Sequence, residues 1–189
     1  MKKQPEVKAQ TEQNLIDAFW SLYCEKRIEK ITVKEITQKA GYNRGTFYEY
    51  FIDVYDVLEQ IEISLIPSLD EMPPIILPDQ HMGMPLDEFL KLYELNSKYY
   101  SVLLGDNGDP AFAGKLKNST KPILKNAFSK GDDTEDMELD YILEYTLSAM
   151  IGIMSYWFLK KKELPAEDLI KLMYELVQNG VMEKLAERK

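Results

Sequence analysis

Apolar residues recur at helical spacing along most of this 189-residue chain, and prolines or glycines interrupt the pattern between segments. Leu15, Phe19 and Leu22, for example, share one face of the first segment. Residues 1–10 are polar and are expected to fray. The spacing and the capping residues predict helices at about 11–26, 33–40, 44–51, 54–66, 86–104, 110–128, 134–160 and 165–186. We therefore expect an all-α fold whose first three helices share a small core.

The stretch from residue 32 to residue 51 contains two short helices joined by a tight turn. Thr32 and Glu35 have the spacing of a capping box, so a helix begins directly after Thr32. Gly41 is suited to end that helix in a left-handed conformation. Asn43 is a good N-cap, so a second helix begins directly after it. The break of about three residues is the spacing of a helix-turn-helix.

The outer face of the second helix has residue types that suit the major groove of DNA. Arg44 and Thr46 lie in its first turn, Tyr48 follows, and Gly45 leaves space for a close backbone approach. The alternative is an ordinary helical hairpin with surface residues. We expect base contacts from Tyr42, Arg44 and Thr46 and phosphate contacts from Thr32, Tyr48 and Tyr50. The full expected set is Thr32, Lys34, Tyr42, Asn43, Arg44, Gly45, Thr46, Tyr48 and Tyr50.

This stretch resembles the DNA-binding domain of the TetR family of bacterial transcriptional regulators. In that family a helix of the form T-V-x-x-I-A precedes A-G-V-S-x-G-T-[LF]-Y-x-[HY]-F. The matching positions are Thr32, Val33, Ile36, Ala40, Gly41, Gly45, Thr46, Phe47, Tyr48, Tyr50 and Phe51. The chain departs from the pattern at Thr37, Tyr42 and Asn43, where Ala, Val and Ser are usual. Val54 stands where the family usually has a lysine that meets a phosphate.

The resemblance implies a helix-turn-helix DNA-binding domain over residues 1–52 and a helical ligand-binding and dimerisation domain over residues 53–189. It also implies a cytoplasmic homodimer that represses transcription at a palindromic operator in double-stranded DNA. A small apolar or aromatic effector would release it, with the helix at 54–66 carrying the signal. The alternative is a protein-interaction module or coactivator of the same fold without a small-molecule ligand.

Charge is distributed unevenly along the chain. The net charge is −9, but residues 1–52 hold nine Lys/Arg against seven Asp/Glu, a net +2, and the remainder carries −11. Phosphate should repel the acidic part, so DNA would meet only the N-terminal domain, through few phosphate contacts. Four lysines in the helix at 110–128 form a loose cluster that we interpret as a solvated face: Lys115, Lys117, Lys121 and Lys125.

Residues 142–158 are apolar almost all round, which indicates a helix buried on both sides. Gly152 lies in its middle, where close contact with another helix would explain a residue that costs about 1 kcal/mol relative to alanine. In the resembled family the last two helices of two chains form a four-helix bundle. The interface expected here comprises Ile151, Gly152, Trp157, Phe158, Met173, Val177 and Gly180.

Aromatic and methionine side chains of the C-terminal part are candidates for an effector pocket between the helices of residues 86–160. They are Tyr93, Tyr99, Tyr100, Tyr145, Met150, Met154, Tyr156 and Trp157. The proline-rich segment 67–85 has several apolar residues, and it is interpreted either as a wall of that pocket or as a linker pinned against the helices. A stripe of this kind is more often simply part of a core.

Other classes of function find little support in the sequence. A single histidine, His81, builds neither a catalytic triad nor a metal site easily, and there is no glycine-rich phosphate loop, so we expect neither an enzyme nor a cofactor. Cys24, the only cysteine, is interpreted as a small core or boundary residue. No apolar run approaches the length of a membrane span, and no signal peptide is visible, which favours the cytoplasm.

Overall fold

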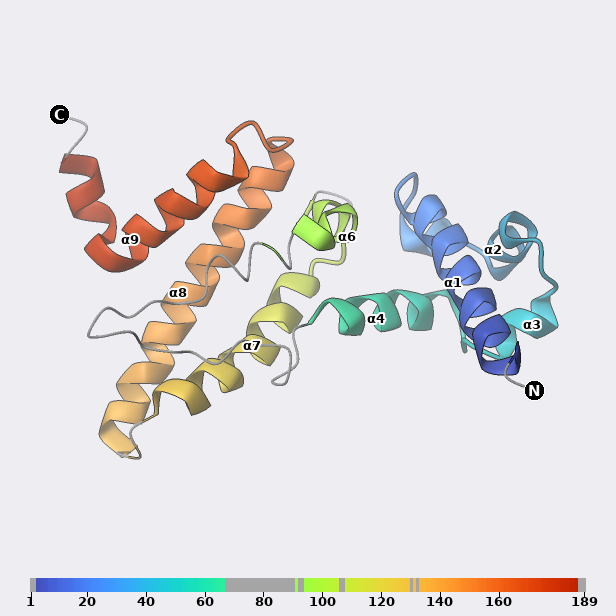
Figure 1. The fold of residues 1–189 in the computed structure, drawn as a ribbon, viewed down its shortest axis with the longest axis horizontal. Coiled ribbons are helices and arrows are strands. Elements are labelled where there is room, and N and C mark those ends of the chain that lie inside the picture. Colours follow the sequence, from blue (N-terminus) through green and yellow to red (C-terminus); the bar gives the residue numbers. More distant parts are fainter. Residues whose placement is uncertain are drawn as a thin grey trace. The chain divides into compact units, whose positions relative to one another are not determined.

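The computed structural model describes residues 3–66, 91, 94–105, 108–129, 131 and 133–186. Every regular element in these ranges is a helix (Figure 1), as expected for an all-α protein. The chain divides into two compact units, Met1–Leu65 and Ile66–Lys189. The proline-rich segment 67–85 and His81 lie outside the described residues.

The first unit contains four α-helices and one short 3-10 helix. They are α1 (Lys3–Tyr23), η1 (Ile28–Lys30), α2 (Val33–Ala40), α3 (Arg44–Tyr48) and α4 (Val54–Leu65). Helix α4 packs on α1 and groups with this unit, whereas the sequence analysis placed it after the domain boundary. Asp53 caps α4 as expected, because its Oδ1 accepts the backbone N–H groups of Tyr55 and Asp56 at 2.8 and 2.9 Å.

The boundaries of α1 and α3 differ from the expected ones. Helix α1 begins at Lys3 instead of near residue 11, because residues 3–10 are mostly good helix formers, which need no apolar face to extend a helix that is anchored further along. Helix α3 ends at Tyr48, although Phe51 is still buried beside Phe47. Cys24 is exposed, not part of the core, and partial burial together with Glu25 raises the pKa of its thiol, so it is not activated.

Fully buried apolar side chains from all four α-helices form the core of the first unit: Leu15, Phe19, Ile36, Phe47 and Val57. Thr37, which stands where the resembled family has alanine, is also buried. Its hydroxyl lies 2.9 Å from the backbone carbonyl of Val33 and donates to it, so the polar group is satisfied inside its own helix. A threonine is therefore tolerated at an alanine position.

The second unit contains α6 (Ser97–Leu103), α7 (Phe112–Phe128), α8 (Asp133–Leu159) and α9 (Ala166–Ala186). Asn96, with φ −106° and ψ 18°, interrupts the single helix that was expected over 86–104. Helix α7 begins two residues after Pro110 and contains Pro122, and its buried face includes Leu124 instead of Ile123. Helix α9 is not continuous either, because Gly180 has φ 77° and ψ 166°.

A ladder of ion pairs joins α7 to α8, the two helices that pack most extensively in this unit. Lys121 lies 3.0 Å from Asp140 and 3.1 Å from Glu144. Lys117 also pairs with Glu144, and Lys125 lies 3.7 Å from Asp140. Three of the four clustered lysines are thus not a free solvated face, as the sequence analysis assumed, since they neutralise carboxylates of the neighbouring helix.

Only one side of α8 is buried within this chain. Leu143, Leu147 and Met154 face the interior, whereas Tyr141, Tyr145 and Tyr156 are 74%, 69% and 62% exposed. Between these tyrosines, three small residues are exposed: Ser148, Ala149 and Gly152. The expectation of burial on both sides is therefore not met by one copy of the chain.

The stretch Asp136–Leu159 of α8 is long and apolar enough to cross a membrane by length and composition, with a mean hydropathy of 1.3, contrary to the expectation from the sequence. The core helix of a soluble protein passes the same test. Here the stretch includes Asp140 and Glu144, both ion-paired to α7. We therefore interpret α8 as a packing helix with one uncovered apolar face.

The ladder makes the stability of the second unit depend on pH. Hydrogen bonds from Lys117 and Lys121 hold the pKa of Glu144 below its ordinary value of 4.5. A carboxyl whose pKa is lower in the folded state stabilises the fold above pH 4.5, and this contribution disappears as the pH falls through the folded-state pKa. We predict that Glu144→Gln lowers the urea midpoint at pH 7 and that this difference vanishes in acid.

The matched control is Glu138→Gln on the same helix, because Glu138 is exposed and has no ion pair in the described part of the chain. Urea unfolding of the two variants and the parent, followed by circular dichroism from pH 7 down to pH 3, measures the effect. An equal loss for both variants at pH 7 would contradict a specific role for the ladder.

Candidate nucleic-acid interface

Local hydrogen bonds define both helices of the motif. The Thr32 hydroxyl accepts the backbone N–H of Glu35 at 3.3 Å, and the Glu35 carboxylate accepts the backbone N–H of Thr32 at 3.0 Å, which completes the predicted capping box. Gly41 has φ 77° and ends α2 in the left-handed region. Asn43 caps α3, since its Oδ1 accepts the backbone N–H of Thr46 at 2.9 Å. These three predictions from the sequence, the capping box, the left-handed Gly41 and the Asn43 cap, are confirmed.

An ion pair also joins the capping box to the turn that follows α1. Lys26 Nζ lies 2.6 Å from Glu35 Oε1. The hydrogen bond from Lys26, with those from Thr32, lowers the pKa of Glu35. The carboxylate at the start of α2 is therefore charged at neutral pH and compensated by a cation, so it adds little repulsion toward a phosphate.

Helix α3 has one buried and one exposed face. Phe47 is fully buried, with its ring centroid 5.5 Å from that of Phe51. Arg44, Gly45 and Tyr48 are exposed on the other side. No hydrogen bond or ion pair is recorded for the Arg44 guanidinium within the described part of the chain, so its five donors are available to a ligand. This is the arrangement that a base-reading helix requires.

Gly45 has a reason inside the protein as well as the one that the sequence suggested. A Cβ at this position would lie 3.0 Å from Asn43 Oδ1, the atom that caps α3. A side chain there would push against the cap. The glycine thus preserves the N-terminus of α3 in addition to leaving that surface bare.

The other expected DNA contacts differ in how available they are. Lys34 and Thr32 are exposed, although the Thr32 hydroxyl also donates to Glu35 at 2.9 Å. Thr46 and Tyr50 are half-buried, and the Tyr50 ring lies 6.3 Å from that of Phe51. The structure therefore brings Lys34, Arg44 and Tyr48 to the surface, with the other side chains partly used inside the motif.

Tyr42 is half-buried, and its hydroxyl is occupied by α1. Asn14 Nδ2 donates to it at 2.9 Å. Hydrogen bonds from Asn14 and Thr11 lower the pKa of the Tyr42 phenol. Asn14 lies outside the apolar face of the first helix, so apolar periodicity does not single it out. The tyrosine at position 42, where the resembled family has valine, is the sign in the sequence that a polar partner is needed.

In the described part of the chain, the residues expected to line an effector pocket lie in different environments. Tyr93 lies outside the described residues. Tyr100, Met150 and Met154 are buried in the core, and Tyr99 is half-buried. Tyr145 points outward. Burial raises the pKa of Tyr100 strongly, as is usual for a phenol in an apolar interior.

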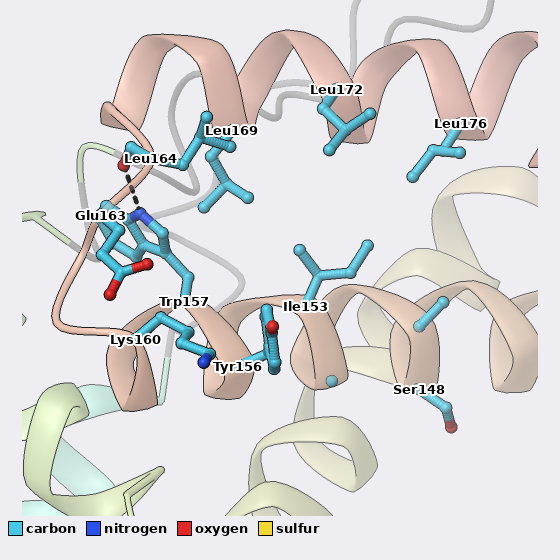
Figure 2. A pocket seen from close by; sticks show the side chains of 12 residues that line it. Ser148, Ile153, Tyr156, Trp157, Lys160, Glu163, Leu164, Leu169, Leu172 and Leu176 are labelled. Atoms are coloured by element: carbon cyan, nitrogen blue, oxygen red, sulfur yellow. Dashed lines mark hydrogen bonds between the residues drawn. The ribbon is translucent and has the colours of Figure 1, made fainter. Parts of the chain in front are cut away.

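A cavity that the structure does describe is an open groove of about 620 Å³ between α8 and α9 (Figure 2). Ile153, Tyr156 and Trp157 line it from α8, and Leu172 and Leu176 from α9. The Trp157 indole donates to the backbone carbonyl of Leu164 at 2.7 Å, which closes one end. Of the residues that the sequence suggested for a pocket, Tyr156 and Trp157 line this groove.

The residues expected at a dimer interface are split between surface and interior. Four of them are already buried by their own chain: Ile151, Trp157, Phe158 and Met173. The sequence did not predict this, because helical spacing alone does not say which face of a helix meets the core. Gly152 is exposed, and Val177 and Gly180 are half-buried. Gly152, with Tyr145 and Tyr156 on either side of it, is the part of this set that a second chain can reach.

Comparison with known proteins finds a matching family and solved structures of the same fold. A TetR family model described as a transcriptional regulator C-terminal region matches residues 85–179, half of the chain. Among curated proteins, none matches it by sequence. Three solved structures have the same fold over almost their whole length, and their low sequence identities limit the likeness to the fold.

One solved structure is a TetR transcriptional regulator from Streptococcus agalactiae 2603V, which is 24% identical, with 92% of this chain and 97% of that chain covered and a TM-score of 0.61. Another is the dihydroxyacetone kinase operon activator DhaS, with 20% identity, 91% and 96% coverage and a TM-score of 0.60. A third is the fatty acid degradation regulator FadR from Bacillus halodurans, with 19% identity, 96% and 98% coverage and a TM-score of 0.58. The family match and the helix-turn-helix geometry lead to one conclusion: this chain belongs to the TetR family of transcriptional regulators and is not an enzyme.

Proposed function

We propose that this protein is a dimeric repressor that binds a palindromic operator in double-stranded DNA in the cytoplasm and leaves it when a small molecule binds. The observation that carries the proposal is the surface of α3, where Arg44 is exposed and unengaged while Phe47 anchors the opposite face. A short, capped helix with a free arginine in its first turn suits base edges in the major groove.

Roles can be proposed for the individual residues of this surface. Arg44 and Thr46 would contact bases, since they lie in the first turn of α3. Tyr48, Tyr50, Thr32 and Lys34 would contact phosphates and so fix the register of the protein on the duplex. Asn43 and Gly45 would preserve the cap of α3, so that the free N–H groups at its N-terminus could face a DNA phosphate. The few cations in this set agree with the small net charge of the N-terminal part.

The exposed face of α8 supports a dimer. A second copy would cover the three exposed tyrosines of α8 and meet its backbone closely at the small residues between them. The apolar groove between α8 and α9 adjoins this face and includes Ser148, Ala149 and Gly152. A two-fold dimer through this face would present two copies of α3 to half-sites about 34–36 Å apart.

The proposed regulation by a ligand is supported by the family match and by the apolar groove between α8 and α9. A small molecule changes operator affinity only if it binds one arrangement of the dimer better than the other. An alternative is a coactivator of the same fold without a small ligand. One of the similar solved structures is an operon activator, so activation of transcription is the alternative to repression.

The proposed role of Arg44 predicts a loss of both affinity and base preference. Arg44→Ala should weaken binding to a site selected from random-sequence DNA by about 1–3 kcal/mol and relax the preference at one base pair, because a bidentate contact to guanine is lost. Tyr48→Phe should weaken all sequences about equally. Fluorescence anisotropy on the selected site and on single-base variants measures both effects.

Lys8→Ala is the control, since it removes an exposed positive charge of the same unit outside the motif. It should change the salt dependence at most by the share of one phosphate contact, a slope of about 0.9, and leave base preference intact. Unchanged binding by both Arg44→Ala and Tyr48→Phe would show that α3 is not the recognition helix.

The proposed dimer predicts a sharp effect at Gly152. A side chain at this position meets nothing within 4 Å in its own chain, so Gly152→Glu should leave the monomer folded while placing a charge in the interface. Gly114→Glu in α7 is the matched control, because a Cβ there also meets nothing within 4 Å. Sedimentation should give a dimer for the parent and the control, and a monomer with little operator affinity for Gly152→Glu.

A parent chain that sediments as a clean monomer at micromolar concentration would remove the dimer from the proposal. A dimeric Gly152→Glu would leave a dimer but place its interface elsewhere.

The proposed effector predicts linkage between two binding reactions. Apolar and aromatic compounds that raise the melting temperature of the protein should lower operator affinity, with a coupling of about 1–3 kcal/mol, or about 5–150-fold. Operator titrations with and without each compound measure this. A compound that binds tightly yet leaves operator affinity unchanged would contradict regulation through that compound.

A further inference from the structure

Helix α3 depends on side-chain attachments for its orientation. With five residues it is too short to be stable as an isolated helix. Phe47 is its only buried residue. A single apolar anchor keeps a short helix on the core but leaves rotation about that anchor weakly opposed, and Arg44 would move with such a rotation.

A second attachment lies at the start of the helix. Tyr42 directly precedes the N-cap Asn43, and its hydroxyl receives a hydrogen bond of 2.9 Å from Asn14 Nδ2 of α1. The two residues are 28 positions apart in the chain. This bond joins the turn before α3 to α1.

The donor is itself held in a defined orientation. Gln10 Nε2 donates to Asn14 Oδ1 at 2.9 Å, which directs the amide nitrogen of Asn14 toward Tyr42. Thr11, one turn from Asn14 on α1, donates its hydroxyl to the backbone carbonyl of Val7 at 2.9 Å and contributes, after Asn14, to the lowered pKa of the Tyr42 phenol. The phenol thus meets an ordered polar set on α1, which the valine of the resembled family would not engage.

We propose that Tyr42 is a positioning residue that, together with Asn14, sets the orientation of the recognition helix α3 and thereby places Arg44 at its base pair. The proposal rests on the DNA-binding function proposed above. It assigns Tyr42 a different role from base contact, because its ring is half-buried and its hydroxyl is already engaged by α1. Two attachments, Tyr42 before the cap and Phe47 within the helix, lie on either side of Arg44 in the chain.

The test is a double-mutant cycle with Tyr42→Phe and Asn14→Ala, which remove the acceptor and the donor of one bond. Each single variant should lose about 2–10-fold in affinity for the selected site, the range of one hydrogen bond, with unchanged non-specific affinity and salt dependence. The double variant should be no weaker than the singles, since both changes break the same contact. Gln13→Ala, an exposed neighbour on α1, controls for changes in that helix.

Three outcomes of the cycle would overturn the proposal. A loss for Tyr42→Phe with none for Asn14→Ala would mean that the phenol contacts DNA directly. Equal losses on specific and non-specific DNA would indicate general destabilisation of the motif. Full affinity in both single variants would show that the bond does not position α3.

A second measurement tests the bond without DNA. In protein labelled with carbon-13 at tyrosine Cζ, the resonance absent from Tyr42→Phe should titrate at a lower pH in the parent than in Asn14→Ala, because the bond from Asn14 lowers the pKa of Tyr42. An identical titration in both proteins would mean that the bond does not form. If this bond is seen but the parent binds no DNA specifically, the proposed function fails, and the positioning role fails with it.

Discussion

A helix that reads DNA must expose one face to the bases while its other face keeps it in place, and α3, for which we propose this role, meets both demands with five residues. Phe47 is fully buried, and it lies between the exposed Arg44 and Tyr48 in the helical sequence. Gly41 ends α2, and Asn43 caps the start of α3. Because so short a helix has little stability of its own, the positions of Arg44 and Tyr48 depend on how the rest of the first unit packs against α3.

Charge is used differently in the two units. In the first, the acidic Glu35 is compensated by Lys26, so the motif surface keeps its small positive charge. In the second, lysines of α7 form ion pairs with carboxylates of α8. The net charge of residues 53–189 is nevertheless −11. Acidic residues repel phosphate, so the second unit is unsuited to DNA, which agrees with the dimerisation and ligand binding that we propose for it.

Helix α8 has two apolar faces with different environments. The face with Leu143, Leu147 and Met154 packs inside its own chain, whereas the face with Tyr145, Gly152 and Tyr156 is open to solvent. Tyrosine is well suited to such an exposed face, because its ring is apolar while its hydroxyl can hydrogen-bond to water. The same two-faced character explains why α8 resembles a membrane span by composition while it carries ion pairs to α7.

The sequence by itself determined the features that depend on a few consecutive residues. The capping box of Thr32 and Glu35, the left-handed Gly41 and the cap of Asn43 each involve partners within about four positions, so residue type and spacing suffice to predict them. Most helices were predictable for the same reason. Exceptions include the longer α1, where apolar periodicity is weak, and the interruptions at Asn96 and Gly180, where local backbone angles leave the helical region.

Only the tertiary structure decided which faces meet. Asn14 and Tyr42 are 28 positions apart, and Lys121 and Glu144 are 23 apart, so no local pattern pairs them. Helical spacing showed that residues 142–158 are apolar but not that Trp157 and Met154 face inward and Tyr145 outward. The helical period relates residues of one helix to each other, whereas the partner of each face is set by how helices distant in the chain pack together.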